Sequence, residues 1–145
     1  MSFHSDVAAV WPADLVTAGV VTAAGQVTFG RTGADKVDAR GAIWIERLPE
    51  TRGGAGGQHV IRYPYLLHLR ATPRNLGSDK TGAAQLTAVE ARAQTIVSRY
   101  NAAVPFLATR TKMLPAAAAE ESLDTDPGEG SYVEATVRVT LSEWE

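Results

Sequence analysis

Apolar and polar residues alternate most regularly near the C-terminal end of the chain, over Tyr132–Trp144. From Val133 to Ser142, every second position is Val, Ala or Leu, and the positions between them are Glu, Thr, Arg and Ser. This period of two predicts a β-strand with one buried face and one solvated face. A shorter strand is predicted over Ala42–Leu48, and weaker strand patterns occur at Val20–Thr22 and Val27–Phe29.

A longer strand is predicted over Gln58–Thr72, because apolar residues share one face and polar residues the other, including Arg62, His68 and Arg70. Pro64 cannot donate a ladder hydrogen bond, so the first half of this strand is expected at a sheet edge or a bulge. The segment before it predicts a long, flexible hairpin tip over about residues 50–58. Four glycines lie in this tip: Gly53, Gly54, Gly56 and Gly57.

A helical pattern covers Thr81–Ala103. Apolar residues recur there at spacings of three and four, which predicts one buried stripe: Leu86, Val89, Ala93, Ile96 and Tyr100. A shorter helix is predicted over Ser5–Thr17, with four residues facing inward: Val7, Val10, Trp11 and Leu15. Pro12 is expected to break or kink this helix, unless a second turn begins there.

The order of these segments is a helix, several strands, the main helix, an acidic stretch and a last strand. Helices segregated onto one face of a mostly antiparallel sheet define an α+β domain. We therefore expect a mostly antiparallel sheet with one main helix packed on one face, a short N-terminal helix and a long β-hairpin. A length of 145 residues with 45% hydrophobic residues fits a single domain over residues 1–145.

Charge is unevenly distributed, although the formal net charge is only −2. Residues 1–115 carry 13 basic and 8 acidic side chains, a balance of +5, and residues 116–145 carry 1 basic and 8 acidic, a balance of −7. Five acids fall in a loop predicted over about residues 115–131: Glu120, Glu121, Asp124, Asp126 and Glu129. This segment is either a solvated loop or an acidic contact with a basic surface on a neighbouring copy. The near-neutral total does not favour a dedicated nucleic-acid-binding module.

Each candidate motif for catalysis or cofactor binding lacks at least one residue that its chemistry requires. The absence of cysteine excludes disulfides, thiolate nucleophiles and cysteine-ligated metals. Leu76–Thr81 resembles a phosphate-binding loop, but Asp79 stands where the second glycine is needed. Asp124–Gly130 resembles a calcium loop that lacks the glycine at its sixth position and the closing glutamate. No G-x-S-x-G segment occurs and the three histidines lack metal-ligand spacing, so no catalytic residue, cofactor or metal is expected.

The order and pattern of the segments resemble a family of phage proteins. The resemblance rests on the N-terminal helix, the hairpin (IWIERLPETRGGAGGQHVIRYPYLLHLRA), the main helix (TAVEARAQTIVSRYNA) and the last strand (YVEATVRVTLSEWE). Together these are similar to the tail terminator and related tail-completion proteins of long-tailed bacteriophages, over most of the chain. Two features depart from that pattern, namely Pro12 in the first helix and the long, irregular segment Val20–Arg40.

This resemblance implies a structural virion protein of the tail or neck that is not an enzyme and that assembles in the host cytoplasm. Proteins of this family form a ring, here expected to be a hexamer, that caps the tail tube. The ring joins the tube to a neck or head-completion protein and lets DNA pass through its bore without sequence-specific binding. No membrane contact is expected. The expected assembly contacts are the glycine tip with Arg52, and the acidic segment facing a basic residue of the adjacent subunit: Arg62, Arg70 or Arg74.

Two other functions remain open. One is another neck component, a stopper or head-completion protein, which shares the size and the structural role but binds on the portal side. The other is a small α+β enzyme or ligand-binding domain. That function would require a pocket that groups His59, His68 or Asp124 with a neighbouring carboxylate.

Overall fold

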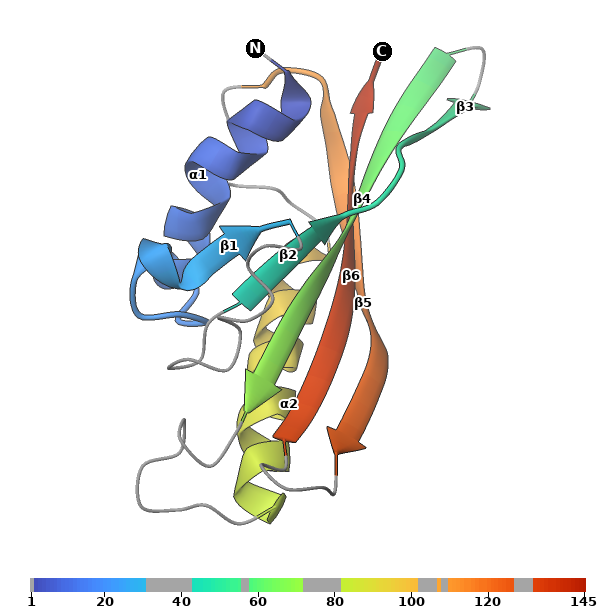
Figure 1. Cartoon of the computed structure of the whole chain (residues 1–145). Coiled ribbons are helices and arrows are strands. Elements are labelled where there is room, and N and C mark those ends of the chain that lie inside the picture. The colour runs from blue at the N-terminus through green and yellow to red at the C-terminus, as the bar shows by residue number, and fades with distance from the viewer. Residues whose placement is uncertain are drawn as a thin grey trace.

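The computed structural model describes residues 2–30, 43–55, 58–71, 82–101, 107, 110–126 and 132–145. Within these residues, two α-helices and six strands form an α+β fold with a mostly antiparallel sheet, which confirms the predicted fold class (Figure 1). The helices are α1 (Phe3–Thr17) and α2 (Gly82–Tyr100), and a 3₁₀ turn, η1, covers Ala24–Gln26. The strands are β1 (Val27–Phe29), β2 (Ile43–Arg47), β3 (Thr51–Ala55), β4 (Gln58–Ala71), β5 (Met113–Asp126) and β6 (Tyr132–Trp144).

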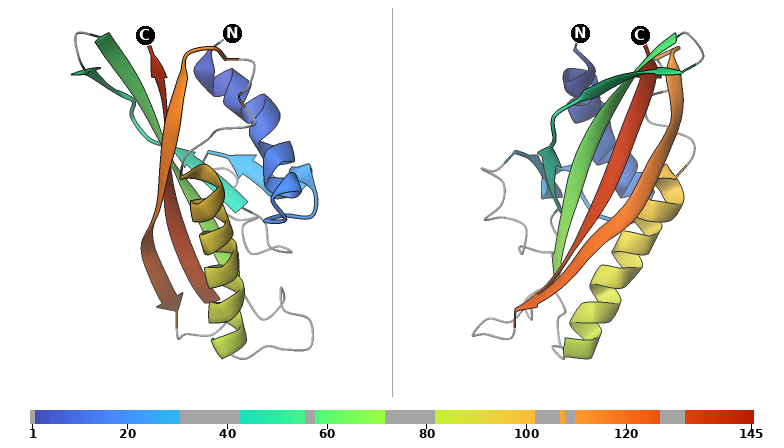
Figure 2. Two further views of the ribbon diagram at one scale, coloured as in Figure 1. Left: turned by 180° about the vertical axis from the view of Figure 1, so that it is seen from behind. Right: turned by 90° about the vertical axis from the view of Figure 1, so that its right-hand side faces the viewer.

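The strands follow the order β1-β2-β4-β6-β5, with β3 beside β4 (Figure 2). β6 pairs with one side of β4 from Val60 to Ala71. β2 and β3 share the other side, where β2 pairs with residues 65–69 and β3 with residues 58–62. These neighbours are all antiparallel except β1 and β2. β4 and β6 are therefore central strands, and β1, β3 and β5 lie at edges of the described sheet.

Pro64 occupies a central strand, so of the two predicted positions, a sheet edge or a bulge, the sheet edge is wrong. On one side of β4, pairing with β2 ends at Tyr65 and pairing with β3 begins at Arg62. Pro64 lies in this interruption, where its carbonyl accepts a hydrogen bond of 3.0 Å from the Leu48 amide. The missing proline N–H therefore costs no ladder hydrogen bond, because the ladder on that side of β4 is already interrupted at Pro64.

Residues 113–126 form strand β5, so the prediction of an acidic loop over about residues 115–131 is wrong for most of its length. β5 pairs with β6 and has register shifts between Leu114 and Ala117 and between Glu120 and Ser122. Pro115 lies within the first shift, where an unpaired residue does not need a donor. The two shifts also disturb the period-two alternation, which removes the usual sequence signal of a strand.

Part of the predicted flexible tip is likewise a strand. Gly53 and Gly54 belong to β3 and pair with Val60 and His59 of β4. Ladder hydrogen bonds use only the backbone, so a glycine segment can pair without contributing side chains. The prediction of a free tip is therefore wrong for residues 51–55, while Gly56 and Gly57 lie outside the described residues.

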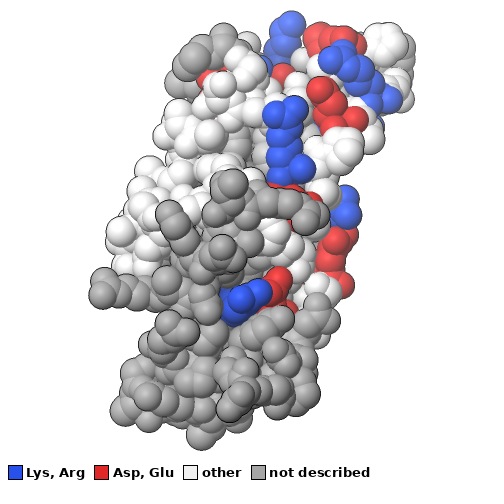
Figure 3. Space-filling model, in the orientation of Figure 1, with Lys and Arg blue, Asp and Glu red and all other residues white. Residues whose placement is uncertain are grey.

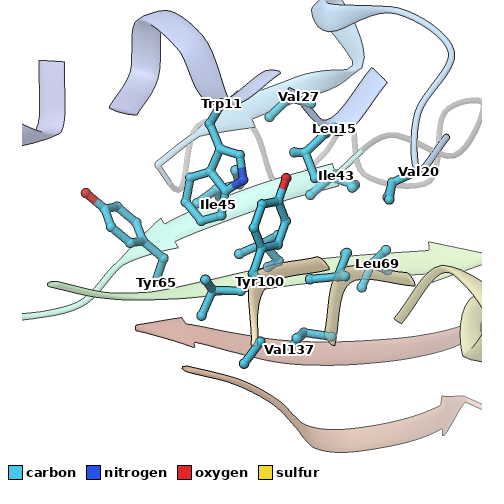
Figure 4. Close-up of a cluster of buried hydrophobic side chains, with 14 of the residues drawn as sticks. Trp11, Leu15, Val20, Val27, Ile43, Ile45, Tyr65, Leu69, Tyr100 and Val137 are labelled. Carbon is cyan, nitrogen blue, oxygen red and sulfur yellow. The ribbon is translucent and has the colours of Figure 1, made fainter. Parts of the chain in front are cut away.

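The main hydrophobic core lies between the sheet and the two helices (Figure 4). Alternate residues of β4 and β6 face this core, as the period of two predicts, and each is at most 7% exposed: Ile61, Tyr63, Tyr65, Leu67 and Leu69, with Val133, Ala135, Val137, Val139 and Leu141. From α2, four residues are fully buried: Val89, Ala93, Ile96 and Tyr100. Leu86 is 39% exposed, contrary to prediction, because the first turns of α2 extend past the ends of the strands (Figure 1).

Helix α1 packs on the same side of the sheet through Val7, Trp11 and Leu15, which are fully buried. The Trp11 ring meets the rings of Tyr65 and Tyr100 edge to face, with centroids 5.3 and 5.7 Å away. Val10 is 37% exposed, so its predicted inward position is wrong, since the buried apolar residues of α1 recur at a spacing of four from Phe3 to Leu15.

Pro12 does not end α1, which runs on to Thr17, so the predicted break is wrong. The missing proline N–H would have bonded to the carbonyl of Ala8. Ala8 is exposed, so water can satisfy that carbonyl. Ala18 caps the end of the helix, and Gly19 follows with a φ of +79°, the left-handed conformation that glycine adopts just after a helix C-terminus.

Candidate assembly surfaces

The face of the sheet turned away from the helices carries charges of both signs, together with apolar side chains such as Val60 and Trp144. It is formed by the even-numbered residues of β4 and β6 and by Trp44 and Glu46 of β2. Figure 3 shows charged side chains gathered over the hairpin end and down the strands of this face. We call this surface the open face.

His68 links three strands across the open face. Its Nε2 lies 3.1 Å from Oε1 of Glu46 on β2, and its Nδ1 lies 3.3 Å from Oε1 of Glu134 on β6. The ring also stacks on Trp44, with centroids 4.2 Å apart and an interplanar angle of 18°. Burial disfavours the charged ring, but the two carboxylates outweigh it and raise the pKa of His68 above 6.5. Two carboxylates facing both nitrogens favour the imidazolium, which alone can donate to both.

Two of the arginines on this face are already paired with carboxylates. Arg70 donates from Nε and Nη2 to Oε2 of Glu134, at 3.2 and 2.8 Å. Arg138 donates to the Glu121 carboxylate across β6 and β5. Of the predicted contact residues, Arg70 and Glu121 are therefore engaged within the chain. Arg74 lies outside the described residues.

The hairpin carries the two other predicted arginines. Arg52 of β3 contacts Glu145, and Glu50 lies 3.8 Å away. Arg62 of β4 is exposed, and no carboxylate among the described residues pairs with it. A Cβ added at Gly53 would lie 3.1 Å from Nη1 of Arg62, so the glycine in β3 leaves room for this guanidinium. The structure thus places Arg52 and Arg62 together at the hairpin, with Gly53 and Gly54.

The predicted acidic residues do not share one surface. Glu121 faces the open face with Arg138, whereas Glu120 faces α2, where Glu90 lies close enough to repel it. Burial first, and then the Glu90 charge, raise the pKa of Glu120, and its Oε2 is buried without a hydrogen-bond partner. Asp124 and Asp126 belong to β5, where they pair with Glu134 and Tyr132 of β6, and Glu129 is outside the described residues.

Sequence reasoning missed two buried charge networks. Asp14 of α1 accepts hydrogen bonds from Arg99 and Tyr100 of α2. Glu143 accepts hydrogen bonds from Tyr63 and from Arg110, which also donates to Asp6. A signal existed for both, because helical spacing places Asp14 near Trp11 and Leu15, and period two places Glu143 on the apolar face of its strand. Their partners could not be read from spacing.

An enzyme or ligand-binding function would require a pocket that groups a histidine with a carboxylate. His68 does lie between two glutamates, but each ring nitrogen faces its own carboxylate and the group lies on the surface of the sheet. Two hollows in the described part of the chain, of about 510 and 440 Å³, lie elsewhere and are lined by Trp144 and by Tyr65 respectively. His59 is exposed on the hairpin. Within the described part of the chain, no three His, Asp or Glu side chains are placed to hold a metal ion.

No protein-family model matches this chain, and no curated protein matches its sequence. No helix within the described segments is long and apolar enough to cross a membrane. The fold and the surfaces described above are therefore the features that bear on function.

Proposed function

We propose that this chain is a structural virion protein of the tail-terminator type, which forms a ring, expected to be a hexamer, at the end of a phage tail tube. The observation that supports this most is the one-sided sheet. The helices gather on one face, while the open face carries charges and continues into the β3–β4 hairpin, which extends from the upper end of the sheet in Figure 1. Such a subunit offers two unlike surfaces.

Assembly would also provide a partner for the outer edge of β5. No described strand pairs with the outer side of β5, which is 14 residues long. An uncovered edge of that length exposes unpaired N–H and C=O groups, and proteins normally cover or disrupt such edges. A neighbouring subunit would cover this edge in a ring. When head-to-tail contacts close into a ring, all subunits point the same way, so the two ends of the ring present different surfaces.

Capping by such a ring is a geometric mechanism without a catalytic residue or cofactor. One end of the ring occupies the growing end of the tube and stops polymerisation. The other end offers a docking surface to a neck or head-completion protein, and DNA passes through the bore without sequence-specific binding. The hairpin with Arg52 would reach the tube or an adjacent subunit, and acidic residues of one subunit would meet arginines of the next.

Negative-stain microscopy of the purified protein, alone and mixed with tail tubes, tests this proposal. We expect rings, and tubes that carry one ring at a single end and no longer grow. Rings that bind only to portal complexes would contradict the terminator function and favour a stopper or head-completion protein. The same protein with residues 50–58 deleted serves as the control for hairpin docking.

A further inference from the structure

A hollow of about 510 Å³ lies on the open face at the base of the β3–β4 hairpin, and we call it the Arg62 hollow. Val60, Leu114, Pro115 and Trp144 contribute apolar surface to it, and Arg62 is its charged residue. Val60 is only 3% exposed, yet it does not belong to the main core. None of the residues that line the hollow carries a carboxylate. The hollow therefore combines an apolar floor with a positive charge that the described residues leave uncompensated.

A second surface has the opposite character. Among the described residues only three large apolar side chains are exposed, and two of them are Leu86 of α2 and Leu123 of β5. Leu86 lies four residues before Glu90, and Leu123 lies three residues after Glu120. Glu90 lies one helical turn after Leu86 on the same face of α2. Glu120 precedes Leu123 on β5 and is repelled by Glu90. Neither glutamate has a cationic partner among the described residues. We call Leu86, Glu90, Glu120 and Leu123 the α2–β5 patch.

These two surfaces lie on opposite faces of the sheet, so they do not meet within one chain. Arg62 and Ser142 place the hollow on the open face. Glu120 instead faces α2, where it is repelled by Glu90. A contact between hollow and patch therefore requires two copies, each using one surface. Such a contact is heterologous, and it closes into a ring when the rotation between copies permits.

We propose that the α2–β5 patch of one copy docks into the Arg62 hollow of the next copy. The inference rests on the proposed function, since it names the contact that would build the ring. Arg62 would offset part of the negative charge of the repelling pair Glu90 and Glu120, and the two leucines would cover the apolar floor beside Trp144. Exposed apolar surface next to unpaired charge is typical of a protein interface.

Two of the contact residues expected from the sequence already have partners within the chain. Arg70 is already bonded to Glu134, and Glu121 is already bonded to Arg138, so neither is free to bind a neighbour without loss. Arg62 and Glu120 each belong to one of the two predicted sets, and neither has such a partner among the described residues. The acidic contribution thus comes from the helix side of β5 rather than from its open face.

Charge reversal in the full-length chain tests the contact. Arg62→Glu and Glu120→Arg should each raise the dissociation constant for self-association by about tenfold or more, measured by sedimentation velocity over a concentration series. Mixing the two variants should restore assembly, because each copy then meets a surface of opposite charge. The double variant R62E/E120R should assemble alone for the same reason. Arg47→Glu is the matched control, since Arg47 is exposed, has no carboxylate partner among the described residues and lies outside the hollow.

Circular dichroism must first show that each variant is folded. Normal self-association of R62E, failure of the mixture and the double variant to assemble, or a monomeric native chain at every concentration would overturn the contact. If R62E assembles normally but loses tail-tube binding, the hollow receives a different protein and the proposal fails. If the charge swap restores rings that do not cap tubes, the contact stands and the proposed function fails.

Discussion

Replacing Asp14 by asparagine should destabilise the fold by about 2–3 kcal/mol, because Asp14 joins the two helices through buried charge. Its side chain is 8% exposed. Arg99 donates from Nε to Oδ2 at 2.8 Å and from Nη2 to Oδ1 at 2.6 Å, and Tyr100 Oη donates to Oδ2 at 2.5 Å. An asparagine side chain at this position would lack the charge and could accept fewer of these bonds.

The magnitude follows from the exposure of the partners. Breaking a buried ion pair by removing one member costs about 3–5 kcal/mol. Arg99 is 27% exposed, so water can solvate part of its guanidinium, and the expected cost is therefore lower, about 2–3 kcal/mol. Tyr100 is fully buried, and Tyr100→Phe should cost about 1.5 kcal/mol for one hydrogen bond to a charged acceptor.

Urea unfolding followed by far-UV circular dichroism measures these costs. The matched control is Arg138→Gln, which removes an arginine–carboxylate pair whose side chains are 41% and 38% exposed. We expect that change to cost less than about 1 kcal/mol. A cost for D14N within about 0.5 kcal/mol of zero, or equal to that of R138Q, would refute the reasoning.

The dependence on pH provides a second check of the same contact. Burial raises the pKa of Asp14, but the hydrogen bonds from Arg99 and Tyr100 outweigh it, so the pKa lies below 3.8. The stability from the charged form is therefore present above pH 3.8 and is lost as the pH falls through the folded pKa. The gap between wild type and D14N should shrink below pH 3.8. A constant gap down to pH 2 would contradict this.

Three further predictions concern the open face and the hairpin. In denaturation experiments, His68→Gln should lower the free energy of unfolding more at pH 5 than at pH 9. The raised pKa of His68 contributes stability that is present below pH 6.5 and is lost as the pH rises through the pKa of the folded state. An equal loss at both pH values would count against this. Deleting residues 50–58 should leave a folded protein by circular dichroism that no longer caps tubes, and unchanged capping would sink the hairpin's assigned role. Self-association should weaken as salt rises from 0.05 to 0.5 M in sedimentation experiments, since exposed charges are screened over about 8–10 Å near physiological ionic strength, and salt-independent association would contradict an electrostatic contact.

The central strands could be predicted from the sequence because each buries a single face. In β4 and β6 the apolar residues at every second position must all point into the core, so the period of two is preserved. The stripe on α2 was predictable for the same reason. The failures at Leu86 and Val10 arise at the margins of the helix contacts, where burial depends on how far a helix extends over the sheet.

The edge strand β1 was predicted at Val27–Phe29. The edge strands β3 and β5 could not be predicted, because pairing rather than side-chain burial makes them strands. β3 is built partly of glycine, and β5 contains Pro115, a run of alanines and two register shifts. Both are held by backbone hydrogen bonds to a central strand, which no local pattern reveals.

The sequence identified which charged residues could make contacts, but it did not show which of them already have a partner within the chain. Arg62 and Arg70 are equivalent in the sequence, on one face of one strand. The register of β4 against β6 places Glu134 directly opposite Arg70, whereas Arg62 lies opposite Ser142. Only that register decides which arginine is left for a neighbour.

Native mass spectrometry of the purified chain at near-physiological salt can show whether the protein assembles into a closed ring. We expect a discrete species at six times the 15.4 kDa chain mass, in equilibrium with smaller assemblies on dilution. A chain that stays at 15.4 kDa at every concentration, in the absence and presence of tail tubes, would contradict it.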